Sequence, residues 1–398
     1  MVIYLEESEL IMQVYSDNTL PILCWAKDLE ESAMEQARNL AEHPCVYNRV
    51  CIMPDGHCGY GMPIGGVIAT KDAVIPNAVG VDIGCSMSAG RTNILTNNIS
   101  EECLQNIVKD IARAIPTGTN HHKEPQVHPI FDDKSRWDNC LICSQEYESA
   151  RYQLGTMGGG NHFVELQVDT DGHLWYMIHS GSRNLGYKVG HYYNKLAEQL
   201  CATWKHDKVV TNQLAFFPRG TKEFDAYWDE MSLCLDFAKA NHDVMVNKIQ
   251  EILSRNIPEL NIEETFYTRH NYAAIESHDD INVIVHRKGA IRAREKDMQI
   301  IPGSQGTASY IVKGLGNPRS FCSASHGSGR AMSRTKAQET LSLEHEIERM
   351  TGIIHNITST KQLDEAPSAY KDIEEVIALE ADLVTPCYKL TPIAVMKG

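Results

Sequence analysis

The chain has 398 residues, of which 42% are hydrophobic and 22% are charged, as is typical of folded globular proteins. This composition excludes collagen-like, coiled-coil and globally disordered proteins, and the length suits one elaborated catalytic domain or two smaller domains. The formal net charge is −15 at pH 7, so a nucleic-acid partner would require a locally basic surface.

The sequence offers no membrane span or secretory signal. The best apolar stretch, residues 65–84, is interrupted by Lys71 and Asp72, whereas a membrane helix needs about 18 apolar residues. The N-terminal segment carries Glu6, Glu7 and Glu9, where a secretory signal would carry positive charge. We therefore expect a cytoplasmic protein with no membrane partner, in which the twelve cysteines are reduced thiols.

Periodicity predicts short strands in the first half of the chain, then two long helices, then a return to strands. The expected strands include residues 65–70, 174–178, 281–285 and 298–301. The expected helices lie at residues 185–205, 222–252 and 336–351. The polar segment 117–139 is predicted to be a surface loop.

This order of elements lacks the regular strand–helix alternation of a parallel doubly wound sheet, and it predicts an α+β fold. The sequence contains no repeat of fixed period and no Gly/Ser linker that would mark a domain boundary. We therefore predict a single catalytic domain over residues 1–398, with a helical insertion at residues 186–262.

Positive charge gathers between Arg287 and Lys336, where ten basic residues accompany only Glu295 and Asp297. A run of this kind is as often a solvated surface as a binding site. Here, however, it is interleaved with two Gly-Ser turns, whose backbone N–H groups are suited to cradling phosphate. The turns lie at residues 302–306 and 326–330, and we predict that this region binds phosphate.

Asp82 and Cys85 stand three residues apart beside flexible glycines, a spacing at which both side chains could reach one metal ion. Alone this signal is weak, because a buried cysteine in an apolar run usually serves packing. His162 and His179 lie at strand-to-turn junctions, and His270 heads a further polar segment. Together these five residues favour a metal centre, although any single histidine is more often a surface or core group.

Two shorter motifs allow several interpretations. Asp55 and His57 could form an acid–base pair, support a metal ligand, or simply build a turn. Cys140 and Cys143 could form half of a zinc site, but no second cysteine pair at zinc-finger spacing accompanies them. We therefore interpret this cysteine pair as structural.

From residue 53 to its last residue, the chain resembles the RtcB family of GTP-dependent RNA ligases. The resemblance is carried by a series of blocks in family order, which is far more specific than any one motif. The blocks include residues 53–57 (MPDGH), 80–85 (GVDIGC), 155–163 (GTMGGGNHF), 179–183 (HSGSR), 270–272 (HNY), 287–290 (RKGA), 301–304 (IPGS), 325–330 (SHGSGR) and 397–398 (KG).

The resemblance implies an α+β fold with stacked mixed β-sheets around a two-metal cleft, flanked by α-helices. It implies an enzyme that joins RNA 2′,3′-cyclic phosphate or 3′-phosphate ends to 5′-hydroxyl ends, in RNA repair or tRNA processing. GTP is the implied co-substrate, with two Mn²⁺ ions per active site and an archease-like activator as a further partner. The implied reaction passes through a histidine–GMP intermediate and an RNA-(3′)pp(5′)G intermediate.

The resemblance also assigns roles to individual residues. The metal ligands correspond to Asp82, Cys85, His162, His179 and His270, and the guanylylated catalytic histidine corresponds to His326. The nucleotide contacts correspond to Asn161, Glu165, Asn271, Ser304, His326, Gly327, Ser328, Gly329, Tyr370 and Lys397. Contacts to RNA phosphate are expected from Arg183, Arg287, Lys288 and Arg330.

Ligand types alone fit Mn²⁺, Zn²⁺ or Fe²⁺, so manganese is implied by the resemblance and not by the residues. Small departures from the family pattern occur at Ser86, Gln305 and Ser328. Two alternatives stay open: a metal-dependent cyclic phosphodiesterase or phosphohydrolase, and an inactive RNA-binding homologue. Neither of them requires His326 as a nucleophile or Lys397 near the chain end.

Overall fold

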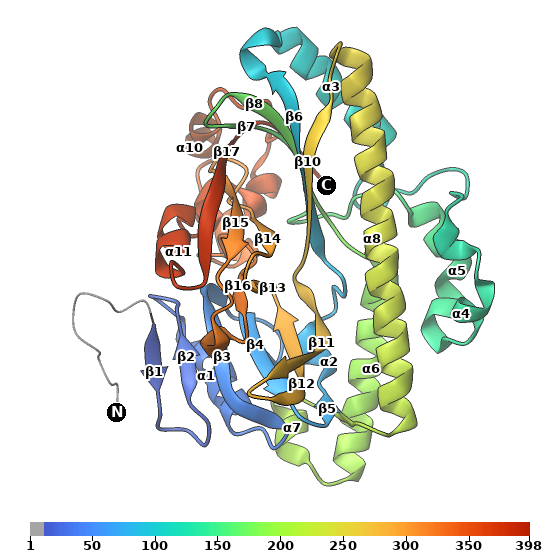
Figure 1. Ribbon diagram of the computed structural model, residues 1–398, viewed down its shortest axis with the longest axis vertical. Coiled ribbons are helices and arrows are strands. Elements are labelled where there is room, and N and C mark those ends of the chain that lie inside the picture. The colour runs from blue at the N-terminus through green and yellow to red at the C-terminus, as the bar shows by residue number, and fades with distance from the viewer. Residues whose placement is uncertain (1–11) are drawn as a thin grey trace.

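The computed structural model describes residues 12–398, so Glu6, Glu7 and Glu9 lie outside the described residues. Two large β-sheets organise this part of the chain (Figure 1). The first has six strands in the order β1 (Gln13–Tyr15), β2 (Ile22–Cys24), β3 (Val46–His57), β4 (Ile64–Thr70), β12 (Ile281–Lys288) and β11 (Asn271–His278). Its neighbouring strands are antiparallel, except for the parallel pair β2 and β3.

The second large sheet is antiparallel throughout and lies above the first in Figure 1. Its order is β10 (Ile262–Arg269), β6 (Ser86–Leu95), β8 (His173–Ser180), β7 (Phe163–Asp169), β17 (Val384–Lys397), β15 (Ser309–Gly314) and β14 (Met298–Ile301). Two small sheets pair β5 (Ala73–Val74) with β9 (Phe217–Pro218), and β13 (Ala290–Arg292) with β16 (Ser323–Ser325).

Helices surround these sheets, and within residues 12–398 none of them is long and apolar enough to cross a membrane. The α-helices are α1 (Glu31–Ala41), α2 (Pro76–Val79), α3 (Glu101–Ala114), α4 (Lys134–Asp138), α5 (Leu141–Gln153), α6 (Arg183–Thr203), α7 (Asp207–Thr211), α8 (Lys222–Asn256), α9 (Arg334–Thr340), α10 (Leu343–Arg349) and α11 (Ile373–Leu379).

Helix α8 is the long support that runs beside both sheets (Figure 1). It begins where the Thr221 hydroxyl accepts the backbone N–H of Phe224, which is a standard N-terminal cap. Its first half contributes Phe224 and Met231 to the hydrophobic core that includes strands of the six-stranded sheet. Its second half contributes Met245 and Ile249 to the core beneath the seven-stranded sheet.

The α+β prediction is confirmed, and residues 298–301 form the predicted strand as β14. The two long helices are also confirmed, as α6 and α8. The single charged helix at residues 336–351 is wrong, because the Ser342 hydroxyl accepts the His345 N–H and starts the separate helix α10. The loop at residues 117–139 is only partly correct, since it contains α4. The single domain and the insertion at residues 186–262 stay predictions.

Candidate metal and nucleotide site

Sheet topology brings the five predicted metal ligands to one end of the seven-stranded sheet. Because β10, β6, β8 and β7 are antiparallel neighbours, the starts of β6 and β7 lie beside the ends of β8 and β10. Asp82 and Cys85 precede β6, His162 precedes β7, His179 lies near the end of β8, and His270 follows β10.

The Cys85 thiol lies at the centre of these ligands. Its Sγ is 3.1 Å from Nε2 of His179 and 3.4 Å from Nε2 of His162. Nε2 of His270 lies 3.4 Å from that of His179, and the Asp82 carboxylate lies 3.5 Å from the His162 ring. The donor atoms form two groups, each within 4.8 Å, and Cys85 belongs to both.

The chemistry of these donors fits divalent transition metals. Burial lowers the pKa of His179 and of His270 well below the ordinary value, which favours the neutral imidazole that binds metals. Burial, followed by the charge of Asp82, raises the pKa of the Cys85 thiol, so a thiolate there requires a compensating cation. Sulfur, nitrogen and carboxylate donors suit Mn²⁺, Zn²⁺ or Fe²⁺, and the residues alone do not choose among them.

His326 follows β16, and its ring centroid is 4.9 Å from that of His270. Its Nδ1 is 2.6 Å from Oδ2 of Asp55, and its backbone N–H donates to the same oxygen. Asp55 is fully buried near the end of β3. Because a carboxylate only accepts hydrogen bonds, Asp55 places the proton on Nδ1 and leaves the Nε2 lone pair available as a nucleophile.

The role of Asp55 was one of several alternatives left open by the sequence. The carboxylate bonds to His326 and not to His57, whose Nδ1 instead contacts the backbone carbonyl of Asp55 at 2.9 Å. The motif around Asp55 was recognisable, but its partner lies 271 residues away in the chain. Gly329 packs against this arrangement, since a Cβ there would lie 2.3 Å from the Asp55 carbonyl oxygen.

The two predicted phosphate-binding turns meet at one cleft of about 160 Å³. Residues 302–305 line it from one turn and residues 326–330 from the other. The predicted nucleotide contacts on its walls are Asn161, Ser304, His326, Gly327, Ser328, Gly329, Tyr370 and Lys397. His179 also lines the cleft, so the predicted metal ligands and the predicted nucleotide contacts lie in one site.

Two predicted nucleotide contacts are absent from the lining of this cleft among the described residues. Glu165 is buried on β7, where burial raises its pKa to about 7. The Asn271 side-chain amide donates to the Asp82 carbonyl at 3.0 Å and accepts from the Gly289 N–H at 2.8 Å. Asn271 thus holds the loop that carries Asp82, one of the predicted metal ligands.

Glu365 was not predicted, yet its buried carboxylate gathers the cationic groups on one wall of the cleft. It lies 3.3 Å from Arg330, 3.1 Å from Arg334 and 3.4 Å from Lys397, and the Tyr370 hydroxyl donates to it. No motif marks Glu365 in the sequence, because its three cationic partners lie about 30 or more residues away in the chain.

Comparison with known proteins identifies the family. The model of the family described as tRNA-splicing ligase RtcB matches residues 36–141 and 131–398. An RNA-splicing ligase RtcB of Escherichia coli K12 is 36% identical, over 97% of this chain and 99% of its own. The chain belongs to the RtcB family. A tRNA-splicing ligase RtcB of Nanoarchaeum equitans is 31% identical over 95% of both chains, and one of Thermococcus kodakarensis is 29% identical over 97% of this chain and 94% of its own.

In this RtcB member, the predictions that Arg287 and Lys288 contact RNA are wrong. The Arg287 side chain is fully buried, and its guanidinium binds both oxygens of Glu276, at 2.5 and 3.1 Å. The Lys288 ammonium donates to the carbonyls of Tyr60 and Asn77, and burial lowers its pKa to about 7. Both side chains are buried and hydrogen-bonded within the protein, so the basic residues between positions 287 and 336 do not form one continuous surface.

The other two predicted RNA contacts stay near the RtcB site. The Arg183 guanidinium donates to the Thr156 hydroxyl and to the Gly118 carbonyl, and lies near the loop at Gly158 that leads to His162. Arg330 lines the cleft, and it also lines a second cavity of about 560 Å³.

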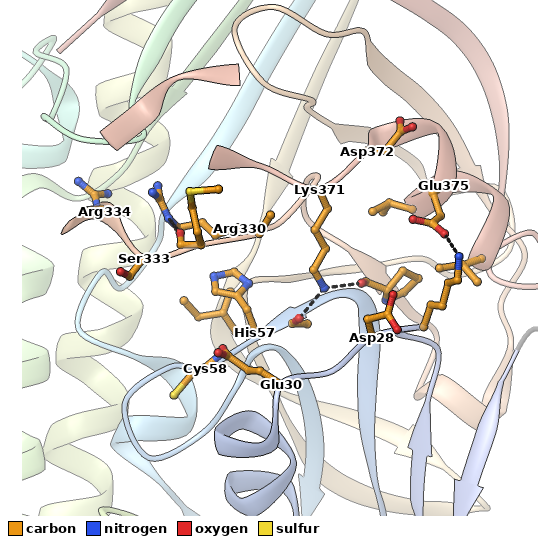
Figure 2. Close-up of a pocket in the computed structure, with 18 residues that line it drawn as sticks. Asp28, Glu30, His57, Cys58, Arg330, Ser333, Arg334, Lys371, Asp372 and Glu375 are labelled. Carbon is orange, nitrogen blue, oxygen red and sulfur yellow. Dashed lines mark hydrogen bonds and ion pairs between the residues drawn. The ribbon is translucent and has the colours of Figure 1, made fainter. Parts of the chain in front are cut away.

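Figure 2 shows the second cavity, whose lining overlaps that of the first. His57, Ile64, Arg330 and Arg334 line both. As Figure 2 shows, the Lys371 ammonium points at the end of β3 beside His57, where it donates to the carbonyls of Pro54 and Gly56. This contact fixes the end of β3 that carries Asp55.

Proposed function

We propose that this protein joins an RNA 2′,3′-cyclic phosphate or 3′-phosphate end to a 5′-hydroxyl end, with GTP as co-substrate and two Mn²⁺ ions. The observation that carries the proposal is the Asp55–His326 pair next to a cluster of five metal donors. A simple metal-dependent hydrolase needs the metal donors but not a histidine whose Nδ1 is held by a buried carboxylate. Membership of the RtcB family supports the same reaction.

In the first step, Nε2 of His326 attacks the α-phosphorus of GTP, forming an N–P bond while pyrophosphate leaves. Asp55 keeps the proton on Nδ1 and stabilises the positive charge that develops on the ring. Divalent ions bound by the two groups that share Cys85 would stabilise negative charge on the phosphate oxygens.

In the second step, an oxygen of the RNA 3′-phosphate attacks the same phosphorus, which breaks the N–P bond and gives RNA-(3′)pp(5′)G. The imidazole of His326 is thereby regenerated. The RNA 5′-hydroxyl then attacks the 3′-phosphate phosphorus, GMP leaves, and the new phosphodiester remains. A cyclic phosphate end must first be opened by water to a 3′-phosphate.

We place the nucleotide in the cleft between the two Gly-Ser turns, which is lined by most of the predicted nucleotide contacts. Gln305 Oε1 and Ser328 Oγ are buried without hydrogen-bond partners among residues 12–398, so they are available to a bound ligand. The cations around Glu365 suit the triphosphate, and we place the RNA end in the adjoining cavity beside Arg330. Contacts of Glu165 with the nucleotide and of Arg183 with RNA phosphate stay predictions.

The test is transfer of label from α-labelled GTP to the protein in the presence of Mn²⁺. We expect label that is acid-labile and base-stable, as a phosphoramidate is, and we expect none in His326→Ala. His345→Ala is the matched control, because His345 is an exposed residue of α10, outside the cleft. Equal labelling of His326→Ala would overturn the proposal.

Metal content measured on the same samples separates a lost nucleophile from a lost metal site. We expect His326→Ala to retain its metal, and Cys85→Ala to lose metal and labelling together. A metal-loaded, folded wild-type chain that takes no label but hydrolyses cyclic phosphate would favour the phosphodiesterase alternative.

A further inference from the structure

Three cysteines and a glutamate meet at a second place in the fold, between α5 and α8. Cys140 caps the start of α5, and Cys143 lies in the first turn of that helix. Glu230 and Cys234 lie one turn apart on α8, so they face the same side. Cys140 is 6% exposed, Glu230 is 1% exposed, and the other two are completely buried.

The donor atoms of this cluster are close together. The two sulfur atoms of Cys140 and Cys143 and a carboxylate oxygen of Glu230 lie within 4.8 Å of one another. Cys234 lies outside this group of three, but its thiol neighbours that of Cys143. Four groups that commonly bind metals therefore converge from two helices at a site separate from Cys85 and its histidines.

Burying a carboxylate and several thiolates together is costly for the fold unless a cation balances their charge. A divalent cation at this cluster would supply that balance, because thiols that bind a metal are deprotonated outright. Among common ions, Zn²⁺ combines a preference for thiolates with a tetrahedral shell of four ligands.

We propose that Cys140, Cys143, Cys234 and Glu230 bind a structural Zn²⁺ ion. The Glu230 carboxylate already accepts the backbone N–H groups of Ile142 and Cys143 and the hydroxyl of Tyr193. These bonds orient the carboxylate, as the outer partners of metal ligands generally do. The sequence did not predict this site, because Glu230 and Cys234 lie far along the chain from Cys140 and Cys143. A glutamate and a single cysteine also do not form the second cysteine pair by which zinc motifs are recognised.

The ion would fasten the helical arm of α4 and α5 to α8, which lies beside that arm in Figure 1. Further along α8, the Asn241 side chain accepts the N–H groups of Gly155 and Thr156, just after α5 ends. Helix α8 would then hold both ends of the segment that leads into the His162 loop. The Zn²⁺ site is therefore assigned to rigidity of this segment and not to catalysis.

The test measures zinc in the full-length chain, purified under reducing conditions and dialysed, for wild type, Cys143→Ser and Cys234→Ser. Cys201→Ser is the matched control, because Cys201 is a buried cysteine of α6 that lies outside the cluster. We expect wild type and Cys201→Ser to hold one more zinc ion per chain than the other two variants. Equal zinc content in all four proteins would overturn the proposal.

Three further measurements keep the test valid if the serine variants fold poorly. The Cys85→Ala chain removes the shared ligand of the catalytic cluster, and we expect it to retain one tightly bound zinc ion; absence of that ion overturns the proposal. A strong chelator should lower the Tm of Cys85→Ala by several degrees. Detection of a disulfide between Cys140 and Cys143 by mass spectrometry of the purified chain would also overturn it, in favour of a redox pair.

Discussion

Oδ2 of Asp55 lies 2.6 Å from Nδ1 of His326, although 271 positions separate the two residues in the sequence. The same oxygen accepts the backbone N–H of His326, so one carboxylate fixes both the ring and the main chain of the proposed nucleophile. Asp55 is fully buried, which excludes competing water and strengthens the contact.

We predict that Asp55→Asn slows guanylylation of His326 by about 10²–10⁴-fold. This is the usual contribution of a group that orients a catalytic histidine and stabilises the positive charge on its ring. The amide keeps the size of the carboxylate but lacks the charge that stabilises a positive ring. Single-turnover labelling with α-labelled GTP measures the rate, and metal analysis verifies that the metal content is unchanged. A rate within about 3-fold of wild type would remove Asp55 from the mechanism.

A second prediction concerns Gly329, which combines a φ of +69° with close contact to the Asp55 carbonyl. Gly329→Ala should lower the free energy of unfolding by more than the roughly 1–2 kcal/mol cost of a left-handed alanine, and should also reduce labelling of His326. Gly220→Ala is the control, because Gly220 has a φ of +84° but open space around its Cβ position. Equal losses of stability and activity in the two variants would contradict this account.

The buried pair of Arg287 and Glu276 gives a third prediction. Arg287→Met should destabilise the fold by about 3–5 kcal/mol, because it leaves a buried carboxylate without its main partner. Arg292→Met removes a more exposed ion pair, with Asp297, and should cost about 1 kcal/mol or less. Urea denaturation compares the two. If Arg287→Met keeps full stability but loses RNA affinity, the assignment of Arg287 to the interior fails.

Glu380 gives a prediction about pH. It is fully buried at the end of α11, accepts the Ser325 N–H, and has its pKa raised to about 8 by burial. Between about pH 4.5 and pH 8, the folded chain keeps a proton that the unfolded chain has released. The contribution of Glu380 to stability is therefore full at low pH and falls as pH rises through this window, by at most about 1.4 kcal/mol per pH unit.

Glu380→Gln should flatten that part of the stability profile, since a glutamine cannot ionise. Thermal unfolding at intervals between pH 5 and pH 8 measures the difference from wild type. Glu375→Gln controls for the loss of an exposed carboxylate that is paired with Lys27. A wild-type profile that is unchanged by Glu380→Gln would show that Glu380 carries no such proton.

The sequence predicted those parts of the molecule that depend on neighbouring residues. Strand β14 and helices α6 and α8 follow from local periodicity, and short motifs at strand ends mark the five residues that the structure brings together as candidate metal donors. Glu365 and Cys234 were missed because their partners are distant in the chain. Arg287 was misassigned because charge alone does not reveal that β11 brings Glu276 beside it.

His270 is the single residue between β10 of the seven-stranded sheet and β11 of the six-stranded sheet. A metal ion bound by the His270 imidazole would therefore stabilise the point at which the backbone crosses from the seven-stranded sheet to the six-stranded sheet. We expect the loaded chain to show slower amide exchange on both sides of this crossing than the metal-free chain, because local opening of either sheet must then disturb the same coordination shell. Metal binding would then both complete the proposed active site and link the two large sheets more rigidly.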